Sequence, residues 1–293
     1  MSEVKDHGSL RSILNSKLAD LIAKCMGQRA NYTIRYFSNR HRWPNFKNPK
    51  DLSERILSSM MSAEFLKYAD YADKVKVREY VKSKGLGELL LEQYGVWENA
   101  DQIDFNKLPD RFILKANNGS GGHVICTNKS ELDIPLTIKK MNEAMNGAQH
   151  YKITEPHYCA IKPMILAEEL MGDGIHLPFD YKFNCINGKV SDIIVASERE
   201  VDAKFCTFDT SWMQLPYVRK QYLPPQMPER PDHLEKMISI AEELSSDFKF
   251  VRVDLYDFQG KVYFGELSFS PWGGMLNIYT TDALDILGAK FEE

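Results

Sequence analysis

The stretch Val251-Arg-Val-Asp-Leu-Tyr-Asp-Phe-Gln-Gly-Lys-Val-Tyr-Phe-Gly-Glu-Leu-Ser268 predicts a β-hairpin that carries two carboxylates on its inner face. Side chains alternate between the two faces of a strand, so Arg252 and Asp254 share one face of the first strand. Gly260 lies six residues from Asp254 and six from Glu266. A turn centred on Gly260 therefore places the two acids across from each other.

The same alternation places Phe264 and Ser268 on the face of Glu266 in the return strand. Two neighbouring carboxylates repel each other, and burying them is costly unless a cation lies between them. Mg²⁺ is such a cation, because proteins usually hold it with one or two carboxylates together with substrate phosphates. The hairpin therefore indicates a metal–nucleotide site, and the alternative is a solvated hairpin with ordinary surface acids.

Length and composition indicate a globular protein. The chain has 293 residues, enough for two domains or for one domain with a lid, and it is 43% hydrophobic and 27% charged. A net charge of −4 predicts no general affinity for nucleic acid. No apolar run approaches the roughly 18 residues that span a bilayer, and the start lacks the basic-then-apolar order of a secretory signal. We therefore expect a cytoplasmic protein.

The cysteines agree with a reducing compartment. They are scattered, odd in number and form no C-x-x-C pair, which argues against a zinc site and a disulfide framework. Their positions are Cys25, Cys126, Cys159, Cys185 and Cys206.

One segment is strongly basic. Residues 21–50 contain seven Lys and Arg residues and no acid, and apolar residues at helical spacing precede them from Leu10 to Cys25. Such a segment could lie on the inner face of an anionic membrane or hold an anionic substrate. The alternative, which we favour, is a helix packed on the body with a solvated basic face.

The coarse pattern changes near residue 109. Residues 1–108 read as mostly helical, with Asp51 and Ser53 both suited to cap a helix. Strands and further helices follow, and Asn187-Gly188 is a strong two-residue hairpin signal. The expected strands are 111–115, 123–126, 161–169, 180–186 and 189–196, and the expected helices are 130–146 and 232–245.

The loop Lys115-Ala-Asn-Asn-Gly-Ser-Gly-Gly-His123 has the chemistry of a phosphate cradle. Its glycines let backbone N–H groups turn towards one anion, and the lysine supplies a fixed positive charge. It is not a Walker loop, because the lysine precedes the glycines and a strand follows them. The alternative is a tight hairpin. The candidate ligand residues are Lys115, Asn118, Gly119, Ser120, Gly121 and Gly122.

Two further groups are candidates for nucleotide binding. The run Ala167-Glu-Glu-Leu-Met-Gly172 could be a hinge that offers backbone groups of Glu168, Glu169 and Leu170 to an adenine edge. Asp180 could bind ribose hydroxyls and Lys182 a phosphate. The alternatives are a solvated strand end and an exposed ion pair of little energetic weight.

The order of these groups along the chain resembles the ATP-grasp superfamily, and most of all its TupA-like branch, which is associated with teichuronopeptide and surface-polysaccharide synthesis. The resemblance covers about residues 50–275 and rests on the order and spacing of several short motifs. These are Asp73-Lys-Val-Lys-Val-Arg-Glu-Tyr-Val81, Leu108-Pro-Asp-Arg-Phe-Ile-Leu-Lys115, Gly119-Ser-Gly-Gly122, Ala167-Glu-Glu169, Asp180-Tyr-Lys-Phe183, Phe250-Val-Arg-Val-Asp-Leu-Tyr256 and Val262-Tyr-Phe-Gly-Glu-Leu267.

The resemblance implies an α+β protein with the ATP-grasp fold, in which two α+β units grip Mg·ATP. The lid would be 109–168 and the C-terminal catalytic subdomain 169–293. Asp254 and Glu266 would bind Mg²⁺, and Arg252 and Lys182 would act on the transferring phosphoryl group or its neighbours. Ser268 stands where many ATP-grasp enzymes have an Asn ligand, which puts a second metal in doubt.

The implied activity is a carboxylate–amine ligase. A substrate carboxylate would attack the γ-phosphate of ATP, and an amine would then displace phosphate from the acyl phosphate to form an amide. The expected partners are a uronic acid of a surface polysaccharide and an amino-acid-like amine, and a homodimer is common in the superfamily. The alternatives are a metal-dependent glycosyltransferase, for which no D-x-D motif is present, and a non-catalytic ATP-binding module.

Overall fold

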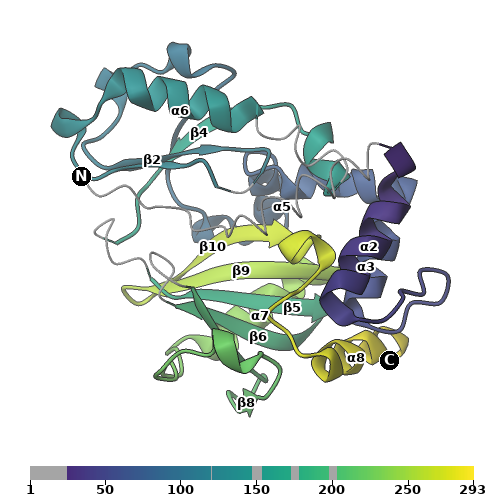
Figure 1. Cartoon of the computed structure of the whole chain (residues 1–293). Helices are drawn as coiled ribbons and strands as arrows, with labels where there is room; N and C mark the ends of the chain where they lie inside the picture. Colours follow the sequence, from purple (N-terminus) through teal and green to yellow (C-terminus); the bar gives the residue numbers. More distant parts are fainter. Residues whose placement is uncertain (1–24, 120, 147–153, 173–177, 198–202) are drawn as a thin grey trace.

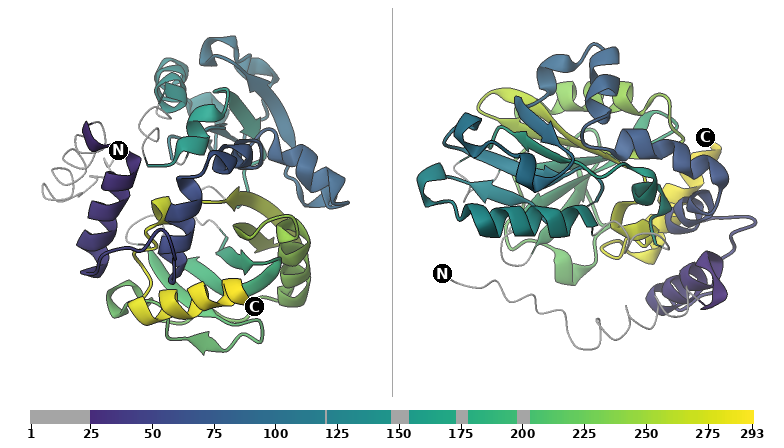
Figure 2. Two further views of the ribbon diagram at one scale, coloured as in Figure 1. Left: turned by 90° about the vertical axis from the view of Figure 1, so that its right-hand side faces the viewer. Right: turned by 90° about the horizontal axis from the view of Figure 1, so that it is seen from above.

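The computed structural model describes residues 25–119, 121–146, 154–172, 178–197 and 203–293. Two antiparallel sheets and their helices form two layers that face each other, with the smaller sheet above the β10 edge of the larger one (Figures 1 and 2). The α+β class and the helical N-terminal region are therefore confirmed. The helix expected over residues 10–25 lies outside the described residues, apart from Cys25.

The smaller sheet has the strand order β1-β4-β2-β3. Helix α6 (Ile134–Asn146) packs on it through Met141 and Met145, which join Phe112 and Leu114 in a buried apolar cluster. β1 comes from the region predicted to be mostly helical, so this sheet takes in residues before the expected lid boundary at 109. The strands are β1 (Gln93–Trp97), β2 (Phe112–Ala116), β3 (Val124–Cys126) and β4 (Ile165–Glu168).

The larger sheet has the order β10-β9-β5-β6-β7-β8. Helix α7 (Leu234–Ser245) covers one face through Met237 and Leu244, which pack in the same core as Phe183 and Val253. The other face is turned to the smaller sheet. The strands are β5 (Asp180–Ile186), β6 (Lys189–Ser197), β7 (Lys204–Phe208), β8 (Gln214–Leu215), β9 (Phe250–Phe258) and β10 (Lys261–Ser268).

The remaining α-helices come from the N-terminal region and the C-terminal end of the chain. The α-helices are α2 (Gln28–Arg40), α3 (Leu52–Met60), α4 (Ala69–Ala72), α5 (Val77–Ser83) and α8 (Thr281–Ala289). Two short 3₁₀ helices matter below, η7 (Pro156–Ala160) and η9 (Pro271–Gly274). No helix of the described residues is long and apolar enough to cross a bilayer.

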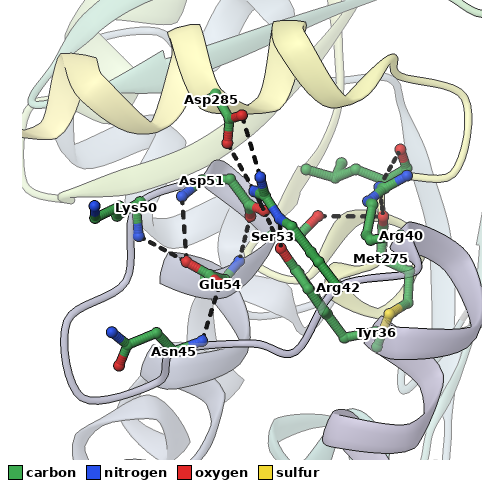
Figure 3. A network of polar contacts seen from close by, with 11 residues as sticks. Tyr36, Arg40, Arg42, Asn45, Lys50, Asp51, Ser53, Glu54, Met275 and Asp285 are labelled. Carbon is green, nitrogen blue, oxygen red and sulfur yellow. Dashed lines mark hydrogen bonds and ion pairs between the residues drawn. The ribbon is translucent and has the colours of Figure 1, made fainter.

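Two arginines of the basic segment are bound within the protein (Figure 3). Asp51 caps α3 by accepting the backbone N–H of Glu54, and its second oxygen accepts from Arg42 at 2.6 Å. Arg42 also pairs with Asp285 of α8 at 2.7 Å, and the buried Arg40 donates to the carbonyl of Met275. This part of the segment is therefore a packed helix and an anchored loop.

In the β9–β10 hairpin Asp254 and Glu266 lie opposite each other as predicted, but a β-bulge is needed to bring them there. Its turn is the pair Gln259-Gly260, with φ of 50° and 76°, and positive φ at both positions is what a type I′ turn requires. Regular pairing from this turn places Phe264 opposite Leu255, on the core face. A β-bulge at Gly265 then shifts the register by one residue and brings Glu266 opposite Asp254.

The bulge corrects one expectation. Phe264 does not share a face with Glu266, because the additional residue at Gly265 reverses the alternation between them. Gly265 is required there, since a Cβ would lie 2.9 Å from the Tyr256 ring and 3.0 Å from the carbonyl oxygen of Asp254. Without the bulge, the Glu266 carboxylate would point into the core.

Candidate active site

The open face of the larger sheet carries its polar residues in three rows that run across β5, β9 and β10. Opposite residues of paired antiparallel strands share a face, so each row is fixed by the strand register. The first row is Asp180, Tyr256 and Tyr263, the second is Lys182, Asp254 and Glu266, and the third is Asn184, Arg252 and Ser268.

The second and third rows form one ion-pair network. Arg252 donates to both oxygens of Asp254, from Nε to Oδ1 at 2.6 Å and from Nη2 to Oδ2 at 2.7 Å. Nη2 also donates to Glu266 Oε1 at 3.0 Å. Lys182 Nζ lies 2.6 Å from both Asp180 Oδ2 and Asp254 Oδ2. Each carboxylate of this network is therefore within reach of a buried cation.

Burial and pairing act in opposite directions on these groups. Burial alone would raise the pKa of Asp254, but the charges of Arg252 and Lys182 outweigh it and hold that pKa below its usual value. Burial would likewise lower the pKa of Lys182, and the adjacent Asp180 and Asp254 raise it instead. Pairing therefore favours the charged forms of Asp254 and Lys182, although both side chains are buried.

A cleft of about 440 Å³ separates this face from the smaller sheet. On the side of the smaller sheet, Lys115 forms an ion pair with Glu168, and Arg78 of α5 lies 3.7 Å from the same carboxylate. Lys74, just before α5, donates from Nζ to the carbonyl of Gly119 at 2.5 Å, and burial lowers its pKa. The volume is within the range of small-ligand sites, roughly 300–1,000 Å³.

Most of the predicted site residues meet in this cleft. Those that line it are Lys115, Gly121, Glu168, Asp180, Lys182, Asp254 and Glu266. Arg252 adjoins it through Asp254 and Glu266, and Ser268 lies buried opposite Arg252. Segments separated by more than a hundred residues in sequence are thus brought to one site.

Other predicted residues face elsewhere. Asn118 is buried and donates to the carbonyl of Met145, at the end of α6. Gly122 packs on α6, because a Cβ there would lie 2.7 Å from the Cβ of Ala144. Ser120 lies outside the described residues. In the glycine loop, Gly121 lines the cleft and Gly119 offers its carbonyl oxygen to Lys74.

The expected hinge is only partly in the cleft. Glu168 and Met171 line it, whereas the backbone N–H of Glu169 donates to the carbonyl of Glu92 at 2.9 Å and Leu170 is buried. Of the residues proposed to meet an adenine edge, Glu168 is therefore the one that reaches the cleft.

Several residues that line the cleft were not among the site residues predicted from the sequence. Lys74 and Arg78 stand four residues apart, a spacing that places two side chains on one face of a helical turn. That spacing was the available signal, but only the fold brings this turn against Lys115 and Glu168. Leu90 and Leu91 supply apolar surface and carried no signal in the sequence, whereas Met171 lies in the run predicted as the hinge.

The donor set fits a Mg²⁺ ion that is shared with phosphate groups. Asp254 and Glu266 face each other as hard oxygen donors, and Glu266 keeps 39% of its side chain exposed. Nowhere in the described ranges do three or more His, Cys, Asp or Glu side chains gather as a metal site. Two protein carboxylates can hold Mg²⁺ when substrate oxygens and water complete the shell, whereas an all-protein cage would need more.

Comparison with known proteins gives a family match. The model of the family described as TupA-like ATPgrasp matches residues 51–292, most of the chain. A comparison with curated protein sequences gives no match.

Several solved structures share a distant likeness. D-alanine–D-alanine ligase from Bacillus anthracis is 14% identical with a TM-score of 0.45, and the match covers 81% of this chain and 64% of the ligase chain. The Helicobacter pylori enzyme of that name is 16% identical with a TM-score of 0.39, covering 75% and 60%. The ATP-grasp ligase PsnB with its minimal precursor is 13% identical with a TM-score of 0.41, covering 78% and 63%. The chain thus spans less than two thirds of the length of these proteins.

Proposed function

The chain belongs to the TupA-like ATP-grasp family, and from this premise we propose that the cleft binds Mg·ATP and activates a carboxylate for attack by an amine. The observation that carries the proposal is the second row, in which Lys182, Asp254 and Glu266 lie side by side with Arg252 bridging both acids. A cationic group between two carboxylates is an arrangement suited to a metal-bound polyphosphate.

The residues that line the cleft suggest how the nucleotide would lie. Glu168 and Met171 line it together with the apolar Leu90 and Leu91, and these four residues would surround the adenine. Asp180 in the first row would meet the ribose. Lys74, Lys115 and Lys182 also line the cleft and would bind the phosphates, so that the γ-phosphate would point towards Arg252.

Charge supports a metal-bound nucleotide rather than free ATP. With every group ionised, the cations exceed the carboxylates by one, which is too little to neutralise a triphosphate alone. Mg²⁺ held by Asp254 and Glu266 would supply the remaining positive charge and polarise the γ-phosphate. The cations are Lys74, Arg78, Lys115, Lys182 and Arg252, and the carboxylates are Glu168, Asp180, Asp254 and Glu266.

The protein's own residues then perform electrostatic catalysis. Arg252 lies where negative charge develops on the transferring phosphoryl group, and Lys182 neutralises the phosphates beside it. The substrate carboxylate becomes an acyl phosphate, and displacement of phosphate by an amine gives an amide. We propose a uronic acid of a surface polysaccharide as the carboxylate, as the family resemblance implies, and an amino-acid-like amine as its partner. Two further predictions are that the chain forms a homodimer and that the basic segment 21–50 contacts a membrane.

The test is an assay of ADP and phosphate release by the purified chain with Mg·ATP, glucuronate or galacturonate, and a pool of amino acids, with products identified by mass spectrometry. We expect release that depends on both substrates, and loss of at least about 100-fold in Glu266→Gln. The matched control is Glu143→Gln, an exposed acid of α6. ATP binding without turnover of any acceptor would favour a binding module, and binding of UDP or GDP in place of ATP would favour a glycosyltransferase.

A further inference from the structure

A carboxylate that the proposed function has not used lies just beyond the third row. Ser270 follows β10 by two residues, and its Oγ donates to Glu155 Oε1 at 2.6 Å. Glu155 immediately precedes η7, in the segment that leads from the smaller sheet. Tyr32 of α2 fixes this segment by donating to the carbonyl of Thr154 at 2.9 Å. Hydrogen bonds therefore fix both the side chain of Glu155 and the backbone next to it.

Glu155 lies on the far side of Arg252 from the nucleotide cleft. The cleft is lined by Asp254 and Tyr256 of β9, and Arg252 is the next residue of that strand on the same face. Ser268 lies opposite Arg252, and Ser270 is one step further along. Along β9 and β10, the cleft residues therefore come first, Arg252 follows, and Glu155 lies beyond Arg252. Glu155 is not among the residues that line the cleft.

The surroundings of Glu155 together raise its pKa, and burial is the largest cause. Burial raises its pKa, the hydrogen bond from Ser270 lowers it, and charges act on it from Arg35 of α2, Glu266 of β10 and Arg252 of β9. Ser270 occupies Oε1, and within the described ranges no hydrogen bond reaches Oε2. One oxygen is therefore oriented by the protein while the other is available to a ligand.

The segment that follows Ser270 carries backbone strain. In η9, Trp272 has the left-handed φ of 51°, which is rare for a bulky residue, and its ring lies 5.3 Å from the Arg252 guanidinium carbon. Gly273 follows at φ 60°, and a Cβ there would lie 3.3 Å from Arg35 Nη2. Strained backbone of this kind tends to occur at ligand sites. Here it sets Trp272 on Arg252 and leaves room for Arg35.

We propose that Glu155 binds the ammonium group of the amine substrate and accepts one of its protons. This inference rests on the proposed function, because the amine must reach the acyl carbon from a side that the nucleotide does not occupy. A carboxylate substrate would be repelled at Oε2, whereas an ammonium group gains a charge-assisted hydrogen bond there. The positive charges of Arg35 and Arg252 would instead attract the carboxylate substrate.

The step balances as follows. The ammonium group gives one proton to Glu155, and the nitrogen lone pair forms the C–N bond at the acyl carbon. The C–O bond to phosphate breaks, and its electron pair leaves with inorganic phosphate. The nitrogen loses a second proton to the departing phosphate, which gives the neutral amide.

A binding experiment tests the site without turnover. The full chain, loaded with Mg²⁺ and a non-hydrolysable ATP analogue, is heated with each of the twenty amino acids and ethanolamine. It is also heated with the same compounds acetylated on every amino group, which lack an ammonium group. We expect at least one free amine to raise the Tm of the wild type and of Glu64→Gln, an exposed control acid. Glu155→Gln should lose this shift and the N-acetylated form should not produce it. No shift with any free amine, or an equal shift in Glu155→Gln, overturns the proposal.

A second assay separates this inference from the proposed function. Hydroxylamine is uncharged at neutral pH and traps an acyl phosphate as a hydroxamate. With glucuronate and Mg·ATP, Glu155→Gln should form hydroxamate within about twofold of the wild type, while its KM for the charged amine rises about 10- to 100-fold, as for a lost charge-assisted hydrogen bond.

Ser270→Ala should show a smaller rise, because Ser270 only positions Glu155. Equal loss of hydroxamate and amide in Glu155→Gln would contradict an ammonium site. Absence of hydroxamate in the wild type would instead count against the proposed carboxylate, and the Tm assay would still decide the role of Glu155.

Discussion

Asp254 is the residue on which the charge network depends. It is 2% exposed and accepts two hydrogen bonds from Arg252 and one from Lys182. These cations neutralise the carboxylate, and a bound metal would share it with them. Removing the acid would leave two buried cations without the counter-charge that they share, which is far costlier than removing a surface acid.

We therefore predict that Asp254→Asn lowers the free energy of unfolding by about 3–5 kcal/mol. Glu266→Gln should cost much less, because Glu266 keeps 39% of its side chain exposed and Arg252 retains Asp254. Urea unfolding followed by circular dichroism measures both variants against Glu143→Gln. Equal stability of Asp254→Asn and the wild type would show that the buried cations do not depend on this acid.

Lys74 and Lys115 are predicted to hold phosphate oxygens from the side of the smaller sheet. Replacing either with Met should weaken Mg·ATP binding about 10- to 100-fold, because each removes a charge-assisted hydrogen bond in a mostly buried site. Isothermal titration calorimetry measures the change. Lys139→Met, on α6, is the control and should bind as the wild type does. An unchanged Kd for both cleft variants would place the phosphates elsewhere.

The buried Asp192, which lies on β6 opposite Asn184 of the third row, predicts a pH dependence of stability. Burial raises its pKa to about 6, from 3.8, although hydrogen bonds from Tyr279 and Asn184 oppose the shift. Because the folded-state pKa is raised, the stabilisation is complete below about pH 4 and is lost as the pH rises through about 6, up to about 3 kcal/mol. Urea unfolding at several pH values should show a steeper fall over this window in the wild type than in Asp192→Asn. Parallel curves would contradict the shift.

At the scale of elements, the hairpin shows what alternation can and cannot predict. Strand propensity, the central glycine and the spacing of the acids predicted that Asp254 and Glu266 face each other, and the register confirms it. Regular alternation from the actual turn would have turned Glu266 into the core. The bulge at Gly265 restores the pairing, and no local pattern distinguishes a bulge glycine from any other strand glycine.

The bulge gives a prediction with an internal control. Gly265→Ala should lower Mg·ATP affinity by at least about tenfold and destabilise the fold by about 1–3 kcal/mol, since the new Cβ would press on the Asp254 backbone. Gly260→Ala, at the left-handed φ of 76° in open space, should cost about 1–2 kcal/mol without changing affinity. Calorimetry and urea unfolding measure the two effects. Normal affinity in Gly265→Ala would mean that the bulge does not aim Glu266.

Elements with strong local signals were predicted well. The Asn187-Gly188 hairpin between β5 and β6, the strand before the glycine loop and the helix before β9 are confirmed. β1 was missed because Gln93–Trp97 is short and contains a glycine, so only its pairing with β4 makes it a strand. Asn118 and Gly122 resembled phosphate ligands in sequence, but the packing of α6 against the loop decides where they face.

At the scale of the whole molecule, a buried polar network around Asn117 joins two chain segments beside the cleft, the turn at Asp73 and the segment that leads into β4. Asn117 at the end of β2 donates to Asp73 Oδ1 at 2.8 Å and to the carbonyl of Lys162, and it accepts the backbone N–H of Met164. The network holds the turn that bears Lys74 against the smaller sheet. The cleft is therefore bounded by parts of the chain that no local sequence pattern could have brought together, which is why Lys74 and Arg78 escaped prediction.

The central claim is that one divalent ion joins Asp254, Glu266 and the phosphates of ATP between the two sheets. A crystal structure of the chain with Mn²⁺ and a non-hydrolysable ATP analogue tests it directly, because anomalous scattering locates the metal. The account predicts a peak within about 2.5 Å of an oxygen from each of these acids and from the phosphates. A nucleotide bound outside the cleft, or a metal that contacts neither acid, would contradict it.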